Sequence, residues 1–201
     1  MSSTKTDPPK ISLGTKITLT SPELQECIKI GQERCSKNKE EKTVNCNYSG
    51  RDDIDISVQG VISEWMFCKL FNIPVTDLYD TRCRNRFNDT FDAHIAGYSV
   101  DVKGPLGHER SIWVNQGKEK NPADLYCLLT LERKHGGKHT PFSADDEIEG
   151  CFQGFIHGEH LLVGGNIQRR GQKYLYTCPS SKLMTLEDIQ KLDPLKFPRL
   201  F

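Results

Sequence analysis

Residues 90–104 alternate between apolar and polar side chains, and this alternation restricts the fold more than any other stretch of the sequence. A period of two is typical of a β-strand with one buried face, and Ala96-Gly97 in the middle indicates a turn, so we predict a hairpin of two short strands. Its apolar side carries Phe91, Ala93, Ile95, Tyr98, Val100 and Val102, and its polar side carries Asp92, His94, Ser99, Asp101 and Lys103. The apolar side should face the core, which leaves the polar side for chemistry.

The polar side of this hairpin brings two carboxylates together. A two-residue turn at positions 96 and 97 would set Asp92 directly opposite Asp101. Facing side chains on antiparallel strands have Cβ atoms roughly 4.5–5.5 Å apart, and like charges at that distance destabilise a sheet unless something neutralises them. A divalent cation would do so, and oxygen ligands from two carboxylates suit Mg²⁺. Lys103, two residues beyond Asp101, lies on the same face.

The main core helix is predicted from about Asp55 to Pro74. Apolar residues recur there at helical spacing, and the proline ends the pattern. Glu64 is the exception, because Val61 and Cys68 at its i−3 and i+4 positions place its carboxylate on or beside the buried stripe. A buried glutamate needs a partner, and one interpretation is an acid at the edge of the core that is paired with an arginine.

The other segments complete a single α/β domain. A supporting helix is predicted from Ser21 to about Cys35, followed by a charged loop over residues 36–53. Further strands are predicted at Ser111–Gln116, Leu125–Leu131 and Gly150–His157, then a hairpin within Asn166–Thr177 and a short helix from Thr185 to about Leu192. The apolar run at 125–131 is typical of a strand buried on both faces and should be central. Residues 1–20 are predicted to be a flexible N-terminal arm, in which residues 17–20 could add an edge strand, and residues 21–201 one domain.

Composition limits the class of protein. Lys plus Arg equals Asp plus Glu at 27 each, so a nucleic-acid surface would have to be local. The eight cysteines include no CxxC pair, and several lie in apolar runs, so we expect reduced thiols of an intracellular protein in the cytoplasm or nucleus. No signal peptide or long apolar span is visible, which predicts a soluble protein that is neither secreted nor membrane-bound.

Asp92 and the run Asp101-Val102-Lys103 resemble the core of the PD-(D/E)xK nuclease superfamily, which has the restriction-endonuclease-like fold. An acid two residues before a lysine also occurs at Glu40-Glu41-Lys42 and Glu132-Arg133-Lys134. The first of these lies in a charged run, and the second lies about 26 Å along a strand from its upstream acid, Asp124, so only the hairpin brings its acids together. The resemblance covers roughly residues 55–157 and leaves residues 158–201 as a C-terminal extension. In the order of its predicted elements the chain is similar to uncharacterised phage and viral members of the superfamily.

The resemblance implies a fold, an activity and a cofactor. The fold would be a mixed β-sheet flanked by helices, and the activity a Mg²⁺-dependent DNA nuclease, with an endonuclease favoured and Mn²⁺ as an alternative ion. Asp92 and Asp101 would hold the metal, with Glu64, which the superfamily often carries on the helix before the hairpin, binding it directly or through water. Lys103 would position the attacking water or stabilise the developing negative charge. Gln116 is a further candidate on the next strand. Phe91 stands where the family name has proline, and no helix is predicted between residues 131 and 150.

The expected partner is DNA, and a homodimer is one alternative for the assembly. Two basic runs are candidates for the DNA contact: Arg82, Arg84 and Arg86 before the hairpin, and Arg169, Arg170 and Lys173 near the C-terminus. His94 is a candidate neighbour of the site or a DNA contact. Two other interpretations stay open. One is a catalytically inactive nucleic-acid-binding or virion structural module. The other is an unrelated half-open sheet whose polar hairpin face simply meets water.

Overall fold

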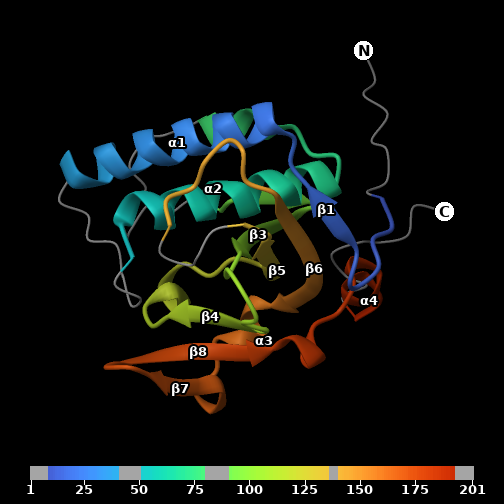
Figure 1. The fold of residues 1–201 in the computed structure, drawn as a ribbon. Helices are drawn as coiled ribbons and strands as arrows, with labels where there is room; N and C mark the ends of the chain where they lie inside the picture. Colours follow the sequence, from blue (N-terminus) through green and yellow to red (C-terminus); the bar gives the residue numbers. More distant parts are fainter. Residues whose placement is uncertain (1–8, 41–50, 80–90, 136–139, 193–201) are drawn as a thin grey trace.

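The computed structural model describes residues 9–40, 51–79, 91–135 and 140–192. These residues form three layers: helices, a five-stranded mixed sheet and a three-stranded antiparallel sheet (Figure 1). The strands are β1 Lys16–Thr18, β2 Ala93–Ile95, β3 Tyr98–Lys103, β4 Ser111–Asn115, β5 Leu125–Arg133, β6 Ile148–His157, β7 Ile167–Arg170 and β8 Lys173–Pro179. The helices are α1 Ser21–Glu40, α2 Asp53–Leu70, α3 Gly158–Leu161 and α4 Leu186–Leu192, and the 3-10 turns are η1 Val75–Tyr79, η2 Lys118–Lys120, η3 Gly164–Asn166 and η4 Ser180–Lys182. The predicted mixed sheet with flanking helices is confirmed.

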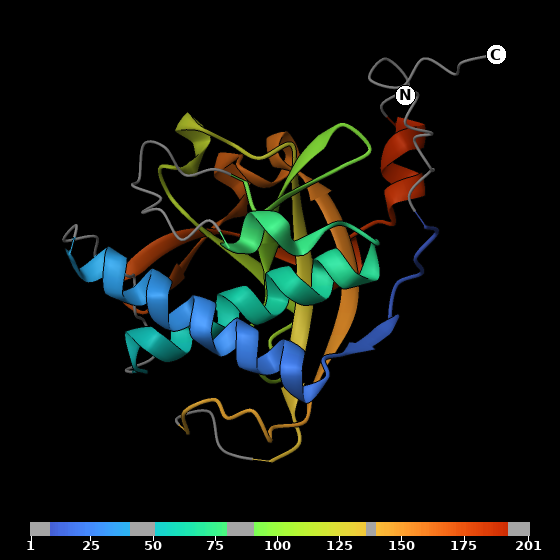
Figure 2. The ribbon, with the colours of Figure 1, turned by 90° about the horizontal axis from the view of Figure 1, so that it is seen from above.

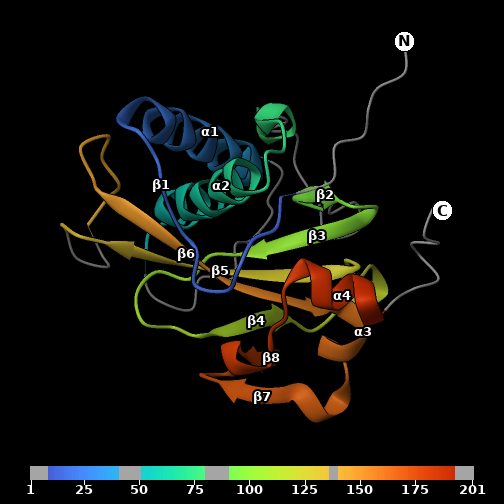
Figure 3. The ribbon, with the colours of Figure 1, turned by 90° about the vertical axis from the view of Figure 1, so that its right-hand side faces the viewer.

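Strand β5 is the centre of the molecule, as its apolar run predicts. The five-stranded sheet has the order β1-β6-β5-β3-β2, in which β5 is parallel to β3 and antiparallel to β6. Every residue from Leu125 to Leu129 is buried, because helices cover one face of β5 and the second sheet covers the other (Figure 3). Side chains of β5 therefore pack alternately on the two layers.

The predicted hairpin is formed by β2 and β3. Ile95 pairs with Tyr98 across a turn in which Ala96 and Gly97 both have positive φ, 49° and 83°, as a two-residue turn of the type I′ class requires. The apolar side faces the core below α2, as predicted for positions 93, 95, 98, 100 and 102. Phe91 is an exception and packs between the two sheets, because β2 begins only at Ala93 and the alternation does not extend back to residue 91.

The two long helices lie together over one face of the five-stranded sheet (Figure 2). A capping box starts α1: Thr20 Oγ1 accepts the Glu23 N–H, and the Glu23 carboxylate accepts the Thr20 N–H at 2.7 Å. The helix continues to Glu40, five residues beyond the predicted end, because residues 36–40 include no glycine or proline and place Lys37 and Lys39 in the last turn. Helix α2 starts at an Asp52 cap, whose side chain accepts the Ile54 N–H at 2.8 Å.

The second sheet has the order β4-β8-β7, and β7 and β8 form the hairpin predicted near the C-terminus. Its inner face packs through Ile112, Val114 and Tyr176 against Tyr126 and Leu128 of the first sheet. A further apolar cluster thus lies between the two sheets. Strand β1 comes from the predicted arm and pairs with β6 at the edge of the first sheet, which corrects the prediction for residues 16–18 in favour of its edge-strand alternative.

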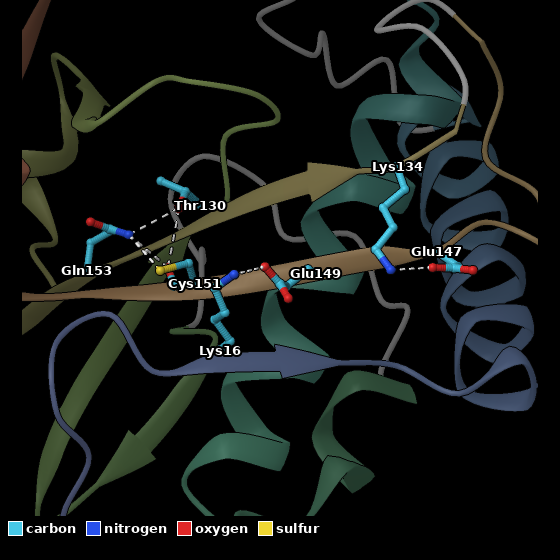
Figure 4. Close-up of polar contacts among 7 residues, drawn as sticks. All are labelled: Lys16, Thr130, Lys134, Glu147, Glu149, Cys151 and Gln153. Carbon is cyan, nitrogen blue, oxygen red and sulfur yellow. Dashed lines mark hydrogen bonds and ion pairs between the residues drawn. The ribbon is translucent and has the colours of Figure 1, made fainter.

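Polar side chains lie in pairs on one face of β1, β6 and the C-terminal end of β5 (Figure 4). Lys16 Nζ lies 2.7 Å from Glu149 Oε1, and Lys134 Nζ lies 2.5 Å from Glu147 Oε2. Gln153 Nε2 donates to Thr130 Oγ1 at 3.3 Å and to Cys151 Sγ at 3.0 Å. Because opposite charges alternate on this face, it presents no concentrated field of one sign.

The six cysteines in the described ranges are free thiols, five of them buried, as predicted for reduced residues. No helix among the described residues is both long enough and apolar enough to cross a membrane.

Helices α1 and α2 approach most closely at Gly31, where a methyl group would have no room. A Cβ on Gly31 would lie 2.6 Å from Val58 Cα, whereas a Cβ on Gly60 would meet only Glu64 Oε1 at 3.9 Å. We expect Gly31→Ala to lower the free energy of unfolding by roughly 1–3 kcal/mol through overpacking. Gly60→Ala, the matched control, should leave it unchanged or raise it by up to about 1 kcal/mol through helix propensity. Urea unfolding of both variants checks this, and equal effects would contradict the close helix crossing.

Candidate functional site

The polar side of the hairpin lies between the two sheets. Val100 and Val102 face the helices, so the alternation turns Ser99, Asp101 and Lys103 toward the second sheet. In the parallel pairing Asp101 stands beside Tyr126, which packs in the cluster between the sheets. Ser99 and Asp101 are only 6% and 5% exposed, so the part of the polar face that they form is shielded from water.

Asp101 is the centre of the cluster, and two lysines neutralise it. Lys103 Nζ contacts Asp101 Oδ1, and Lys118 Nζ of η2 lies 3.4 Å from Oδ2. Burial alone would raise the pKa of Asp101, but the charges of Lys103 and Lys118 outweigh burial and lower this pKa below its ordinary value. Burial likewise opposes the charge of Lys103, but Asp101 and Asp92 outweigh it and raise the pKa of that ammonium. The cluster is therefore a mutually stabilised set of ions.

Asp92 lies one residue before β2, whose pairing with β3 begins at Ala93 and Val100. The register thus stops short of the predicted pairing of Asp92 with Asp101. The Asp92 N–H donates to the Val100 carbonyl at 2.9 Å, and its carboxylate oxygen Oδ2 accepts the Val102 N–H at 2.7 Å. The side chain therefore continues the hydrogen-bond ladder beyond the end of β2, which gives Asp92 a structural role besides any chemical one.

Glu64 belongs to the helical layer and not to this cluster. Its Oε2 lies 2.7 Å from Arg34 Nη1 of α1, and Arg34 Nη2 donates to the Leu78 carbonyl at 3.2 Å. Both side chains are largely buried, at 9% and 15% exposure. The structure therefore brings Lys103 onto Asp101 and within reach of the charge of Asp92, but it places Glu64 elsewhere, because α2 covers the opposite face of β3 and directs this carboxylate toward α1. The alternative of an acid paired with an arginine describes the contact.

Two contributions to the polar face were not found from the sequence. Lys118 reaches Asp101 from the loop after β4, two residues beyond the candidate Gln116, which is itself exposed in the turn. Asp124 accepts both the N–H and the hydroxyl of Ser99 through Oδ2, at 2.9 and 2.8 Å, and its own N–H donates to Ser99 Oγ at 2.9 Å. The only signal was position, since Asp124 directly precedes the predicted central strand and so begins beside β3.

The remaining candidates are spread over the surface. His94 is exposed on β2 and its ring lies 6.1 Å from that of Phe91. Arg169, Arg170 and Lys173 are exposed on the β7–β8 hairpin. Arg82, Arg84 and Arg86 lie outside the described residues.

The donor set decides which metal site is feasible. The described part of the chain contains no group of three or more His, Cys, Asp or Glu side chains that could hold a metal ion. Asp92 and Asp101 are the two carboxylates whose charges act on Lys103, and Mg²⁺ is commonly bound through one or two carboxylates together with waters and substrate phosphates. The residues therefore fit a two-carboxylate site that a substrate phosphate completes, and they do not fit an all-protein cage.

Removing the charge of Asp101 should destabilise the fold. We expect Asp101→Asn to lower the free energy of unfolding at pH 7 by roughly 2–3 kcal/mol, slightly less than for a fully buried pair because the Lys103 side chain is 31% exposed. A carboxyl whose folded pKa is lowered stabilises the fold above its ordinary pKa, and this contribution is lost as the pH falls through the lowered value. The difference between wild type and variant should therefore hold near neutrality and shrink in acid, as measured by urea unfolding across this range.

Asp92→Asn is the matched control for this experiment. Its amide oxygen can still accept the Val102 N–H, so the loss should stay below about 1.5 kcal/mol. If Asp101→Asn has the same free energy of unfolding as wild type at neutral pH, the ion pairs of Asp101 with the two lysines do not stabilise the fold.

Comparison with known proteins assigns the chain to a family without assigning it an activity. No curated protein and no solved structure matches the sequence. One family matches residues 9–191, which is most of the chain and includes every strand of both sheets and the described helices apart from the last residue of α4. The chain therefore belongs to DUF5843, a family of unknown function.

Proposed function

We propose that this protein is a Mg²⁺-dependent DNA nuclease, an endonuclease of the PD-(D/E)xK type with a restriction-endonuclease-like core. One observation carries the proposal: Lys103 contacts Asp101 on the same face of β3, and Asp92, directly before β2, is close enough for its charge to raise the pKa of Lys103. The burial of Asp101 adds support, because a carboxylate that served only solubility would lie at the surface. DNA as the partner follows from the resemblance and from the basic side chains of the β7–β8 hairpin.

Asp92 and Asp101 would hold the ion. When bound there, Mg²⁺ (or Mn²⁺) would polarise the scissile phosphate and lower the pKa of a coordinated water. Glu64 has no part in this site while it is paired with Arg34.

Lys103 would act as a fixed positive charge. Because the pKa of its ammonium is raised by Asp101 and Asp92 against the effect of burial, Lys103 stays protonated at neutral pH and can donate a hydrogen bond. It is therefore unsuited to be a general base, and it would hold the phosphate or stabilise the negative charge that develops on it.

Charge balance gives Lys118 a role beside Lys103. The two carboxylates and the two lysines of the cluster sum to zero, so a phosphodiester would add a negative charge to a neutral site. Lysine side chains are flexible and have three donors each, so both ammonium groups can turn from Asp101 to phosphate oxygens when DNA is bound. Asp101 would then have its carboxylate available to the ion. The same lysines would thus stabilise the fold in the free protein and the charge that develops on the phosphate in the transition state.

A second candidate function is a nucleic-acid-binding module that does not cut. It is favoured by one specific observation: Lys103 and Lys118 already neutralise Asp101, so the facing acids do not require a cation for stability. In such a module Lys103 would be a phosphate contact and nothing more. Incubating the purified protein with plasmid, linear and single-stranded DNA, with Mg²⁺, Mn²⁺ or EDTA, separates the two. Metal-dependent cleavage supports the nuclease, and binding without cleavage under any of these conditions supports the module.

The substitution Lys103→Ala tests the role of the lysine. A group that acts mainly in the transition state can be removed with little loss of substrate binding, so the variant should bind DNA in Ca²⁺ about as well as wild type. Its cleavage rate in Mg²⁺ should fall roughly a hundredfold or more. Binding is measured by fluorescence anisotropy and cleavage by single-turnover assays on folded protein, as judged by circular dichroism.

Lys120→Ala is the control for this substitution. Lys120 is an exposed lysine of η2, the same turn that carries Lys118, and its loss should leave the rate unchanged. If Lys103→Ala loses DNA affinity by the same factor as it loses cleavage rate, Lys103 contacts the phosphate of the bound substrate as strongly as that of the transition state. That result would refute the transition-state role.

A further inference from the structure

The tip of the β7–β8 hairpin exposes an aromatic ring on the face through which Tyr176 packs into the protein. Tyr174 and Tyr176 are two residues apart on β8 and so share one side of the strand. Tyr176 packs between the two sheets and is 7% exposed, whereas Tyr174 is 56% exposed. An exposed tyrosine that continues a buried aromatic face has no packing reason to be there.

Arg169 lies beside this tyrosine. The register of the hairpin pairs Arg169 directly with Tyr174, and directly opposed residues of an antiparallel pair project to the same side. Arg169 is exposed, and its Nε–H donates to the Gly171 carbonyl at 3.0 Å, which holds the guanidinium group next to the turn. A ring and a guanidinium group thus stand side by side at the tip.

This pair is on the side of the second sheet that faces the first sheet. Tyr176 and Ile167 share that side and pack against the cluster that contains Tyr126. Asp101 is the neighbour of Tyr126 on β3 and points to the same layer. The aromatic tip and the ion cluster therefore face the same interlayer side of the molecule, from opposite sheets.

Arg170 has a different environment on the other side of the hairpin. Its Nη2 donates to Glu109 Oε2 at 3.0 Å, and its guanidinium carbon lies 4.6 Å from the centroid of the Trp113 ring. Because a carboxylate and a ring already engage Arg170, its charge is compensated within the protein. Arg169 is thus the better candidate of the two for an external anion.

We propose that Tyr174 and Arg169 bind an unpaired base and its adjacent phosphate, so that the substrate of the proposed nuclease is DNA with a single-stranded segment. This inference rests on the proposed function. A tyrosine can stack on a base only when the base is not stacked within a duplex, and such stacking tolerates any sequence. A guanidinium group binds phosphate oxygens in two parallel hydrogen bonds and would fix the backbone beside the stacked base.

The test measures the affinity of wild type and variants by fluorescence anisotropy, with Ca²⁺ in place of Mg²⁺. The probes are a labelled oligothymidine of about 20 nucleotides, longer than a typical single-strand site, and a labelled duplex of equal length. Tyr174→Ala should weaken binding to the single strand about tenfold, whereas its affinity for the duplex should stay within about twofold of wild type. Tyr174→Phe should bind like wild type, since the ring is kept. Arg169→Ala should weaken binding to both probes and reduce the salt dependence by about one counterion.

Val163→Ala is the matched control, because Val163 is another exposed apolar side chain, 45% exposed, in the segment just before β7. It should leave both affinities unchanged, and thermal melts should show all variants folded, since Tyr174 and Arg169 contribute little buried area. Equal affinity of Tyr174→Ala and wild type for the single strand would overturn the inference, and so would a loss shared equally by the duplex.

The cleavage assay keeps this inference separable from the proposed function. If wild type cuts DNA but Tyr174→Ala binds the single strand normally, the inference fails and the nuclease stands. If wild type binds the single strand through Tyr174 but cuts no DNA under any divalent metal, the inference stands for the binding module and the nuclease fails. If wild type neither binds nor cuts DNA, both are overturned.

Discussion

Burying a carboxylate between two sheets is unfavourable unless positive charge lies within a few ångströms, and this constraint organises the polar part of the molecule. Asp101 meets it with two lysines of different origin. Lys103 is supplied by the alternation of β3 itself, which returns a side chain to the same face after two residues. Lys118 comes from the segment between β3 and β5. This segment leaves the first sheet, forms β4 in the second sheet and returns through η2 to the start of β5. The topology and the electrostatics therefore depend on each other.

In the proposed function, the stability of the fold and the binding of a phosphate would compete for the same lysines. In the free protein the ammonium groups stabilise Asp101, whereas a bound phosphate would offer them a second set of oxygens. A divalent ion at Asp92 and Asp101 would in turn replace the positive charge that the lysines withdraw. A buried ion cluster of this kind does not by itself show that the ions make the fold more stable, because apolar residues can often replace such a cluster without loss of stability. Such a cluster is easier to explain if a bound ligand takes over some of the ionic contacts that its members make with one another.

Periodicity explains which parts of this structure could be predicted. The β2–β3 hairpin, the central β5 and the β7–β8 hairpin each follow from alternation or from an unbroken apolar run, which are local properties of the chain. Helix phase showed that Glu64 lies near buried side chains, but it could not tell the sheet from α1 as the neighbour, because Arg34 lies on a different helix. Lys118 had no local signal, since its contact with Asp101 spans the gap between two sheets. Contacts between layers are set by tertiary packing, and a single sequence does not record them.

The second sheet also decides between two views of the hairpin. A half-open sheet would leave the polar face of β3 in water, where Asp101 and Ser99 would need no special partners. Instead, both residues are buried. Ser99 forms three hydrogen bonds with Asp124, and Asp101 lies between two ammonium groups. Lys118 and Asp124 come from the segment that follows β4, whereas Lys103 belongs to β3, so the polar face is specified by the covering chain together with β3. A covered, charge-balanced face of this kind costs more to build than a solvated one, and that cost is the physical reason to look for chemistry there.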